Sequence, residues 1–189
     1  ASEGQAIVLV ADPRESSKGL VEDISKGLNQ VGVNVVHIGT LPTPGLAFTA
    51  RENDEFVAGV MITASHNPVQ YNGVKVFDAQ GDKLPDSTES VLNELIENGA
   101  PDRGLGTFKL DLSYVQAYEE WLVEADEGKR GEGQKQDSDR ANGAASGSEA
   151  KERERRGAEV THRVERADGK NSKEQGGASG KKAVQKRGK

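Results

Sequence analysis

The chain of 189 residues contains no cysteine, one methionine and one tryptophan. Without cysteine it can form neither disulfides nor thiolate metal sites, and a cysteine nucleophile is excluded. No apolar run approaches the roughly 20 residues that a membrane-spanning helix needs. Residues 1–10 lack the basic region and the long apolar region of a secretory signal. We therefore expect a cytoplasmic protein with no membrane partner.

The last third of the chain lacks large apolar residues. Residues 127–189 contain no Leu, Ile, Met, Pro or aromatic residue, and they carry 17 Lys and Arg against 11 Asp and Glu. Such a segment cannot bury enough apolar surface to offset the entropy lost on folding, so we predict a disordered, low-complexity tail. Residues 1–126 carry 20 Asp and Glu against 8 Lys and Arg. This acidic charge disfavours nucleic-acid binding there, because it repels phosphates.

Residues 1–126 alternate between strand-like and helix-like patterns. Apolar runs predict strands at 6–11, 33–38 and 56–63, and a short alternating strand is predicted at 73–78. Helical spacing of apolar residues predicts helices at 17–31, 43–53, 86–98 and 112–125. Crossovers of ten or more residues between successive strands imply right-handed parallel units. The predicted fold class is therefore α/β, a three-layer α/β/α domain with a mostly parallel sheet.

The loops at 12–17, 39–44 and 64–72 each follow a predicted strand, and ligands bind at the carboxyl ends of parallel strands. The third loop contains Ser65, His66 and Asn67, with Lys75 shortly after it. A serine at a strand end can carry a phosphate, and the neighbouring imidazole, amide and ammonium groups could hold that charge. Taken alone, however, such a run of residues is usually just a turn.

The run T-A-S-H-N-P at 63–68, followed by N-G-V-K at 72–75, resembles the phosphoserine loop of the α-D-phosphohexomutases. That family includes phosphomannomutase/phosphoglucomutase and phosphoglucosamine mutase. Three further stretches also resemble family motifs: D-P-R-E-S-S at 12–17, L-P-T-P at 41–44 and G-D-K-L-P at 81–85. The resemblance covers about residues 1–126.

The resemblance implies a Mg²⁺-dependent transfer of a phosphoryl group on hexose phosphates, through a phosphoserine and a hexose 1,6-bisphosphate. The sugar would be mannose, glucose or glucosamine phosphate. Ser65 would carry the phosphoryl group and, through its phosphate, bind the metal. Lys75 would be the general acid and base, with His66 and Asn67 supporting the loop. Arg14 either holds its own turn or contacts the substrate.

The resemblance also implies that residues 1–110 form the family's first domain, incomplete at its N-terminus. Residues 111–126 would then be a linker helix toward a second domain. The family binds its metal with a D-x-D-x-D-R loop, and the tail offers only D-S-D-R at 137–140, which we interpret as a coincidence.

Three hypotheses remain open at this point. The chain is a truncated mutase domain that is inactive alone, with a tail read in a shifted frame. Alternatively, it is a working phosphoacceptor or binding module that docks other domains supplied in trans. The third hypothesis is a non-enzymatic regulatory fragment whose basic tail binds polyanions, including nucleic acid weakly. Self-association is also expected, because a sheet edge that partner domains would cover is left open.

Overall fold

The structure is a computed structural model that describes residues 5–99, 104–125, 135–139, 144 and 159–163. Its elements, in chain order, are β1 (Ala6–Ala11), α1 (Ser17–Gln30), β2 (Asn34–His37), α2 (Thr43–Arg51), β3 (Phe56–Ile62), β4 (Val74–Asp78), α3 (Asp86–Asn98), β5 (Phe108–Leu110), α4 (Ser113–Ala125), β6 (Lys135–Asp139) and β7 (Glu159–Arg163). No helix in the described part of the chain is long and apolar enough to span a membrane.

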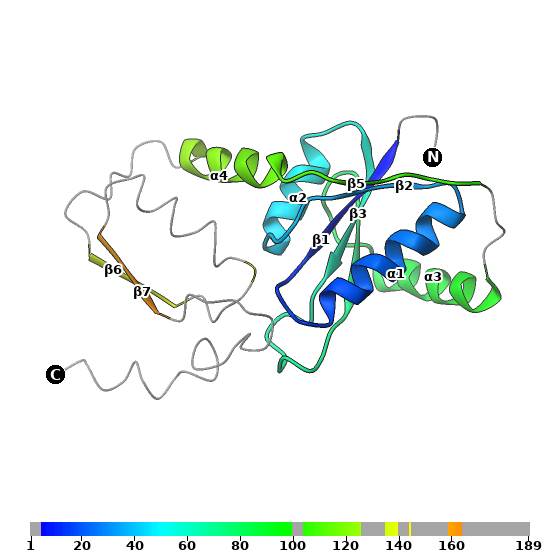
Figure 1. The fold of residues 1–189 in the computed structure, drawn as a ribbon, viewed down its shortest axis with the longest axis horizontal. Helices are drawn as coiled ribbons and strands as arrows, with labels where there is room; N and C mark the ends of the chain where they lie inside the picture. The colour runs from blue at the N-terminus through cyan, green and yellow to red at the C-terminus, as the bar shows by residue number, and fades with distance from the viewer. Residues whose placement is uncertain (1–4, 100–103, 126–134, 140–143, 145–158, 164–189) are drawn as a thin grey trace.

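The main sheet has the strand order β4-β3-β1-β2-β5. The central strand β1 pairs in parallel with both β2 and β3, and β2 pairs in parallel with β5. Only β4 runs antiparallel, because it returns directly from β3 through a hairpin. The prediction of a mostly parallel sheet is confirmed, and Figure 1 shows the strands gathered between the helices.

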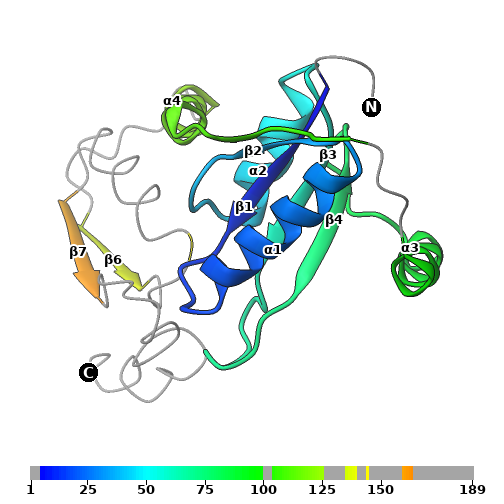
Figure 2. The ribbon, with the colours of Figure 1, turned by 45° about the vertical axis from the view of Figure 1, so that its right-hand side comes forward.

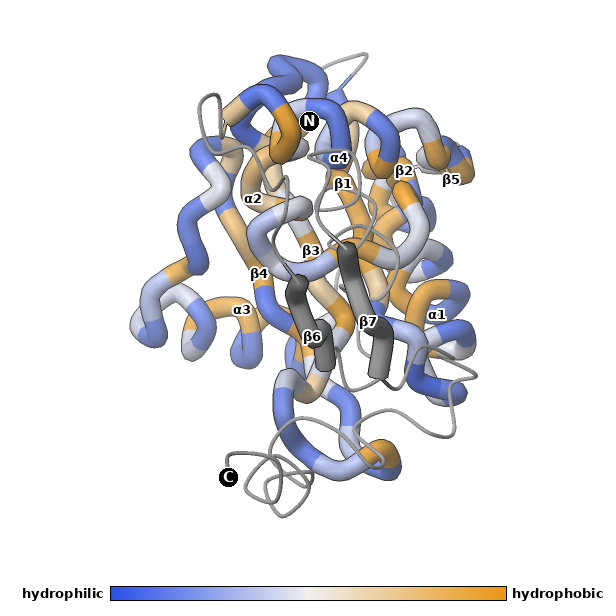
Figure 3. The backbone as a smooth tube through the Cα atoms, turned by 90° about the vertical axis from the view of Figure 1, so that its left-hand side faces the viewer, coloured by the Kyte–Doolittle hydropathy of each residue, from blue (hydrophilic) through white to orange (hydrophobic). Residues whose placement is uncertain are grey.

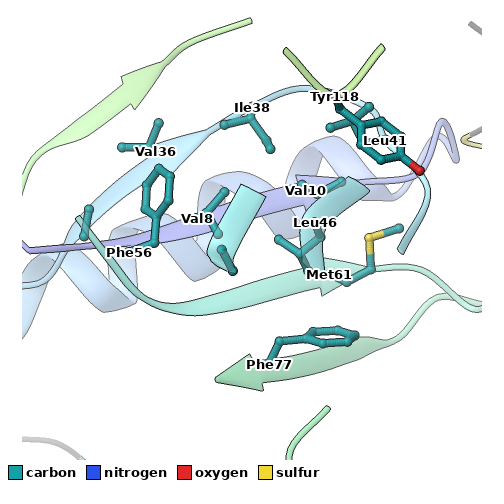
Figure 4. Packing of buried hydrophobic residues seen from close by; sticks show 12 residues of the cluster. Val8, Val10, Val36, Ile38, Leu41, Leu46, Phe56, Met61, Phe77 and Tyr118 are labelled. Carbon is teal, nitrogen blue, oxygen red and sulfur yellow. The ribbon is translucent and has the colours of Figure 1, made fainter. Parts of the chain in front are cut away.

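Helices cover both faces of this sheet, with α1 in front of the strands and α2 behind them in Figure 2. On the α1 face, Val21 packs with Leu9 and Ile62 in one buried cluster. On the other face, Leu46 of α2 packs in a second cluster with buried residues of the strands, shown in Figure 4. Figure 3 shows the apolar strands running between the more polar helices. The three-layer α/β/α prediction is therefore confirmed.

The last helix before the tail, α4, packs onto this second cluster through Tyr118, which is buried. Its first residue is held by Asp111, whose Oδ1 accepts hydrogen bonds from the Ser113 amide at 3.0 Å and hydroxyl at 2.6 Å. The hydrogen bond from Lys109 and those from Ser113 lower the pKa of Asp111 to about 2. The segment predicted as a linker helix thus packs on the first domain, and the boundary at residue 110 stays a prediction.

The sequence does not predict β5, β6 or β7. Strand β5 extends the main sheet beside β2, whereas β6 and β7 pair in parallel as a separate two-stranded sheet. These two short strands lie inside the segment predicted as a disordered tail, and most of the rest of 127–189 lies outside the described residues. Of the D-S-D-R run, residues 137–139 lie in β6 and Arg140 is outside the described residues.

One buried polar group on α1 provides a stability test. The Ser25 side chain is buried, and its Oγ has no hydrogen-bond partner among the residues that the structure describes. Replacing Ser25 with alanine should raise the free energy of unfolding by about 1 kcal/mol, because it removes an unsatisfied hydroxyl and improves helix propensity. Urea denaturation of both proteins would measure this change.

Ser17, eight residues earlier and equally buried, serves as the matched control. Its Oγ donates to Asp12 and accepts a hydrogen bond from Asn72, both at 3.0 Å. Replacing Ser17 with alanine should therefore lower the free energy of unfolding by about 1–2 kcal/mol. If both variants shift stability in the same direction, the contrast between a satisfied and an unsatisfied hydroxyl is wrong.

Candidate active site

The loops that follow β1, β2 and β3 lie together at the carboxyl-terminal end of the sheet, because these three strands are parallel. In Figure 2 the loop after β1 and the loop after β3 both lie at the lower end of the sheet. The hairpin between β3 and β4 is closed by a hydrogen bond of 2.8 Å from the Thr63 amide to the Gly73 carbonyl. A Cβ atom at Gly73 would lie 3.2 Å from the Thr63 carbonyl oxygen, so glycine permits this close approach.

Ser65 occupies an unusual backbone position on this loop. Its φ is +55°, and it is the only non-glycine residue with positive φ that the structure describes. Such a conformation is uncommon for residues with a side chain, and it persists only where surrounding contacts impose it. The Ser65 side chain is exposed, and its hydroxyl makes no hydrogen bond within the described residues. The strained backbone therefore presents an exposed hydroxyl at the carboxyl-terminal end of the sheet.

The contacts that impose this conformation come from Arg14. Its side chain is fully buried beneath the loop. Nη1 donates to the carbonyl oxygens of Pro68 at 2.7 Å and Tyr71 at 2.9 Å. Nη2 donates to the carbonyl oxygens of Ser65 at 3.1 Å and Asn67 at 2.9 Å. One guanidinium thus fixes four carbonyl groups of the loop.

The remaining donor of Arg14, Nε, binds Oδ2 of Asp12 at 2.8 Å. All five N–H groups of a guanidinium are then used inside the protein. The structure therefore favours the first of the two roles expected for Arg14, holding its turn and the loop. The second role, substrate binding, has no free donor in this conformation.

Asp12 anchors the other side of this network. Its carboxylate accepts hydrogen bonds from the Arg14 amide and side chain, and from the hydroxyls of Ser17 and Thr63. The Thr63 hydroxyl, in turn, accepts a hydrogen bond of 2.9 Å from the Ser65 amide. A continuous path of hydrogen bonds therefore runs from a buried carboxylate to the backbone of the exposed serine.

The far end of the loop is fixed by Asn72. Its amide nitrogen donates to the hydroxyls of Ser16 and Ser17, each at 3.0 Å, and its Oδ1 accepts from the Gly73 amide at 2.9 Å. The loop is therefore joined to the start of α1 at Asn72 and to the end of β1 at Arg14. Because the Asn72 and Arg14 hydrogen bonds both connect the loop to the segment after β1, the position of Ser65 depends on the pairing of β1 with β3.

The structure places the other expected site residues on the same hairpin. His66 and Asn67 follow Ser65, and both side chains are exposed and make no hydrogen bond within the described residues. Lys75 lies on β4, opposite Met61 of β3, and is half-buried with no ion pair in the described residues. No hydrogen bond joins Lys75 to Ser65. The structure therefore places Ser65, His66, Asn67 and Lys75 on one hairpin but shows no hydrogen bond between their side chains.

Three residues that hold the loop, Asp12, Thr63 and Asn72, have no role assigned by the sequence analysis. One signal for them is positional, since Asp12 and Thr63 are the first polar residues after two apolar strands. Adjacent parallel strands bring such residues together at the carboxyl-terminal end of the sheet. Their hydrogen-bond partners, however, depend on side-chain directions that the sequence does not contain.

The described residues do not form a metal site by themselves. No group of three or more acidic or histidine side chains converges within the parts of the chain that the structure describes. The nearest acidic group in the network, Asp12, has its carboxylate engaged by four donors. The described residues alone therefore offer Mg²⁺ no converging set of acidic ligands.

The comparisons with known proteins agree with this architecture. Residues 1–103 match the family model described as phosphoglucomutase/phosphomannomutase, alpha/beta/alpha domain I. The chain is 45% identical over 108 residues to a phosphoglucosamine mutase of Thermus thermophilus, covering 57% of this chain and 24% of the relative. It is 44% identical over 96 residues to a phosphoglucosamine mutase of Ruminiclostridium cellulolyticum, covering 51% and 21%.

Among solved structures, a phosphoglucomutase/phosphomannomutase family protein of Burkholderia thailandensis matches with a TM-score of 0.74 and 26% identity. That alignment covers 89% of this chain and 37% of the other, a longer stretch than the resemblance read from the sequence. The chain spans about a quarter of the length of the curated relatives it matches. Because the family model matches more than half of its residues, the chain belongs to the phosphoglucomutase/phosphomannomutase family, whose first α/β/α domain it contains.

Proposed function

We propose that this chain carries the phosphoserine of a phosphohexomutase, with Ser65 as the phosphoryl acceptor and donor. The observation that carries the proposal is the exposed Ser65 hydroxyl at φ +55°, held there by four carbonyl contacts to the buried Arg14. Such a site keeps its backbone fixed while its hydroxyl stays open to a ligand. The proposed substrates are hexose phosphates, with glucosamine phosphate suggested by the names of the relatives.

In the proposed reaction, a phosphoryl group passes from Ser65 to a hydroxyl of the bound hexose monophosphate. The bond between phosphorus and Ser65 Oγ breaks, a bond to the sugar oxygen forms, and the sugar hydroxyl proton ends on Ser65 Oγ. Lys75 is the proposed group that moves this proton, because it is the cationic side chain of the same hairpin. His66 and Asn67 are proposed to hold the phosphate, since both side chains have free polar groups.

We propose further that this chain does not complete the mutase cycle alone. Its described residues offer a Mg²⁺ ion one phosphate and no converging acidic group. Mutase turnover would therefore require residues from elsewhere, on further polypeptide or on a second protein. The regulatory alternative, with a tail that binds polyanions, stays a prediction because that tail lies mostly outside the described residues.

Phosphoryl transfer to Ser65 is the direct test. Incubating the full chain with glucose 1,6-bisphosphate and Mg²⁺ should add one phosphoryl group to its intact mass, and fragmentation should place it on Ser65. The Ser65→Ala variant should gain nothing. Ser87 is also exposed but lies on α3, away from the loop, so the Ser87→Ala variant should react like the unmodified chain.

An unchanged mass after prolonged incubation would contradict the role of Ser65 as a phosphoryl acceptor in this chain. In the same samples, interconversion of glucosamine 1- and 6-phosphate should be absent. Measurable turnover would show that the chain completes the cycle without further domains, and it would overturn that part of the proposal alone.

A further inference from the structure

Strand β5 forms one edge of the main sheet, with β2 on one side and no strand on the other within the described residues. Two large apolar side chains of β5 are half-exposed, Phe108 at 50% and Leu110 at 57%, and so is Leu112, at 57%, in the turn before α4. An exposed apolar edge is a template for pairing with another strand, and proteins usually protect such edges. These exposed side chains make β5 a candidate edge for pairing with another strand.

The backbone of β5 is oriented for that pairing. The Thr107 carbonyl accepts from Val35 of β2, and the Asp111 amide donates to His37 of β2. Because successive residues of a strand direct their amides to opposite sides, the amide and carbonyl of Leu110 point away from β2. Among the described residues, Leu110 therefore offers one unpaired donor and one unpaired acceptor at the open edge.

The sequence at this edge is self-complementary. Residues 108–112 read F-K-L-D-L. When two copies of this segment run antiparallel with the Leu110 residues opposite each other, Lys109 of each copy faces Asp111 of the other. Each charged residue thus meets an opposite charge, and Leu110 meets Leu110.

The sheet geometry keeps these two kinds of contact apart. Phe108 and Leu110 lie opposite Val35 and His37 of β2, on the α1 face of the sheet, whereas Lys109 lies opposite Val36 on the other face. A two-fold axis perpendicular to the sheet keeps each face on its own side. The contact between the two Leu110 side chains would therefore form on one face and both Lys–Asp pairs on the other.

We infer that two copies of this chain associate through their β5 edges, antiparallel, about a two-fold axis at Leu110. The two Leu110 residues exchange hydrogen bonds, and the Lys109–Asp111 pairs occupy the neighbouring positions without backbone hydrogen bonds, where side chains lie closest. The interface is isologous and closes after two copies. The loop that contains Ser65 connects β3 to β4, and β1 and β2 separate β3 from β5. The Ser65 side chain therefore stays accessible in both copies.

Charge reversal tests the register. Within one copy, Lys109 Nζ contacts Asp111 Oδ2 at 2.7 Å, and the Lys109 side chain is 66% exposed. The Lys109→Asp variant would place Asp against Asp at both positions of a dimer, and the Asp111→Lys variant would place Lys against Lys. Sedimentation velocity should show a concentration-dependent dimer for the unmodified chain. Each variant should raise its dissociation constant roughly tenfold or more.

Mixing the two variants separates association from folding. In a mixed dimer the aspartate introduced at position 109 of one copy faces the lysine introduced at position 111 of the other. The unchanged Lys109 and Asp111 face each other at the second position, so both pairs are restored. Neither single variant regains its own internal pair on mixing. Native mass spectrometry should therefore show the mixed dimer and little of either homodimer. The Lys83→Asp variant changes the charge equally at another exposed ion pair and should dimerise normally.

The Leu110→Pro variant is a second route if Asp111→Lys does not fold. It removes the outward amide but no hydrogen bond to β2, so it should keep the circular dichroism of the unmodified chain and remain monomeric. An unmodified chain that is monomeric at every concentration would overturn the inference. So would homodimers of either charge variant that are as stable as the unmodified dimer.

Discussion

Replacing Arg14 with methionine is expected to lower the free energy of unfolding by about 3–5 kcal/mol. Methionine fills much of the same volume but supplies no donor. The variant leaves the Asp12 carboxylate buried without its cation, and four loop carbonyls lose the N–H groups that they accept from. Breaking a buried ion pair on one side is costly because the other charge stays out of water.

Guanidinium chloride denaturation of both proteins would measure this loss. Arg51 provides the matched control, because it also forms an ion pair at 2.8 Å, with Glu52, but both side chains are about half exposed. The Arg51→Met variant should change stability by less than about 0.5 kcal/mol. Similar losses for the two variants would show that the buried position of Arg14 has no special importance.

Arg14→Lys separates stability from the shape of the loop. Lysine keeps the positive charge beside Asp12, but its three donors on one nitrogen cannot reach the carbonyls that the two Nη atoms reach now. This variant should fold and yet accept the phosphoryl group more slowly at Ser65. Unchanged phosphorylation would show that the four carbonyl contacts do not position the serine.

The second large effect is expected at Gly81, in the turn that follows β4. Its φ is +81°, and an added Cβ atom would lie 2.5 Å from the carbonyl oxygen of Ala47 on α2. An L side chain is strained at this φ, and the clash is with backbone that cannot rotate away. Gly81→Ala should therefore lower the free energy of unfolding by about 2–4 kcal/mol, measured by urea denaturation.

Gly27 gives the opposite expectation for the same chemical change. It lies on the exposed side of α1, has no atom within 4 Å of an added Cβ and has no positive φ. Gly27→Ala should raise the free energy of unfolding by about 0.5–1 kcal/mol, because alanine favours the helix. If both alanine variants destabilise the protein to a similar extent, close packing against Ala47 is not what requires glycine at position 81.

The order of elements was predictable because it depends on local patterns. The apolar run of β1 and the helical spacing of Val21 and Ile24 on α1 are both visible in the sequence. The family resemblance also located the Ser65 loop on motif residues alone. Gly81 belongs to one of those motifs, and the structure supplies the physical reason for its glycine, the approach of Ala47.

The missed parts depend on contacts between distant residues. Strand β5 has only three residues, and its pairing with β2 joins residues more than 70 positions apart. The role of Arg14 could not be decided because the sequence does not show where the guanidinium points. The two predicted roles, turn and substrate, differ only in which acceptors lie around it, and those acceptors are 51 to 57 residues away.

The distance along the chain between Arg14 and the loop has a consequence during synthesis. Arg14 leaves the ribosome some fifty residues before the carbonyls that it binds, and the contacts cannot form until β1 and β3 are paired. A molecule in which β1 and β3 have not yet paired therefore lacks the backbone shape that presents Ser65. If Ser65 is the phosphoacceptor, a chain still on the ribosome should not accept the phosphoryl group before β3 and its loop have emerged and paired with β1.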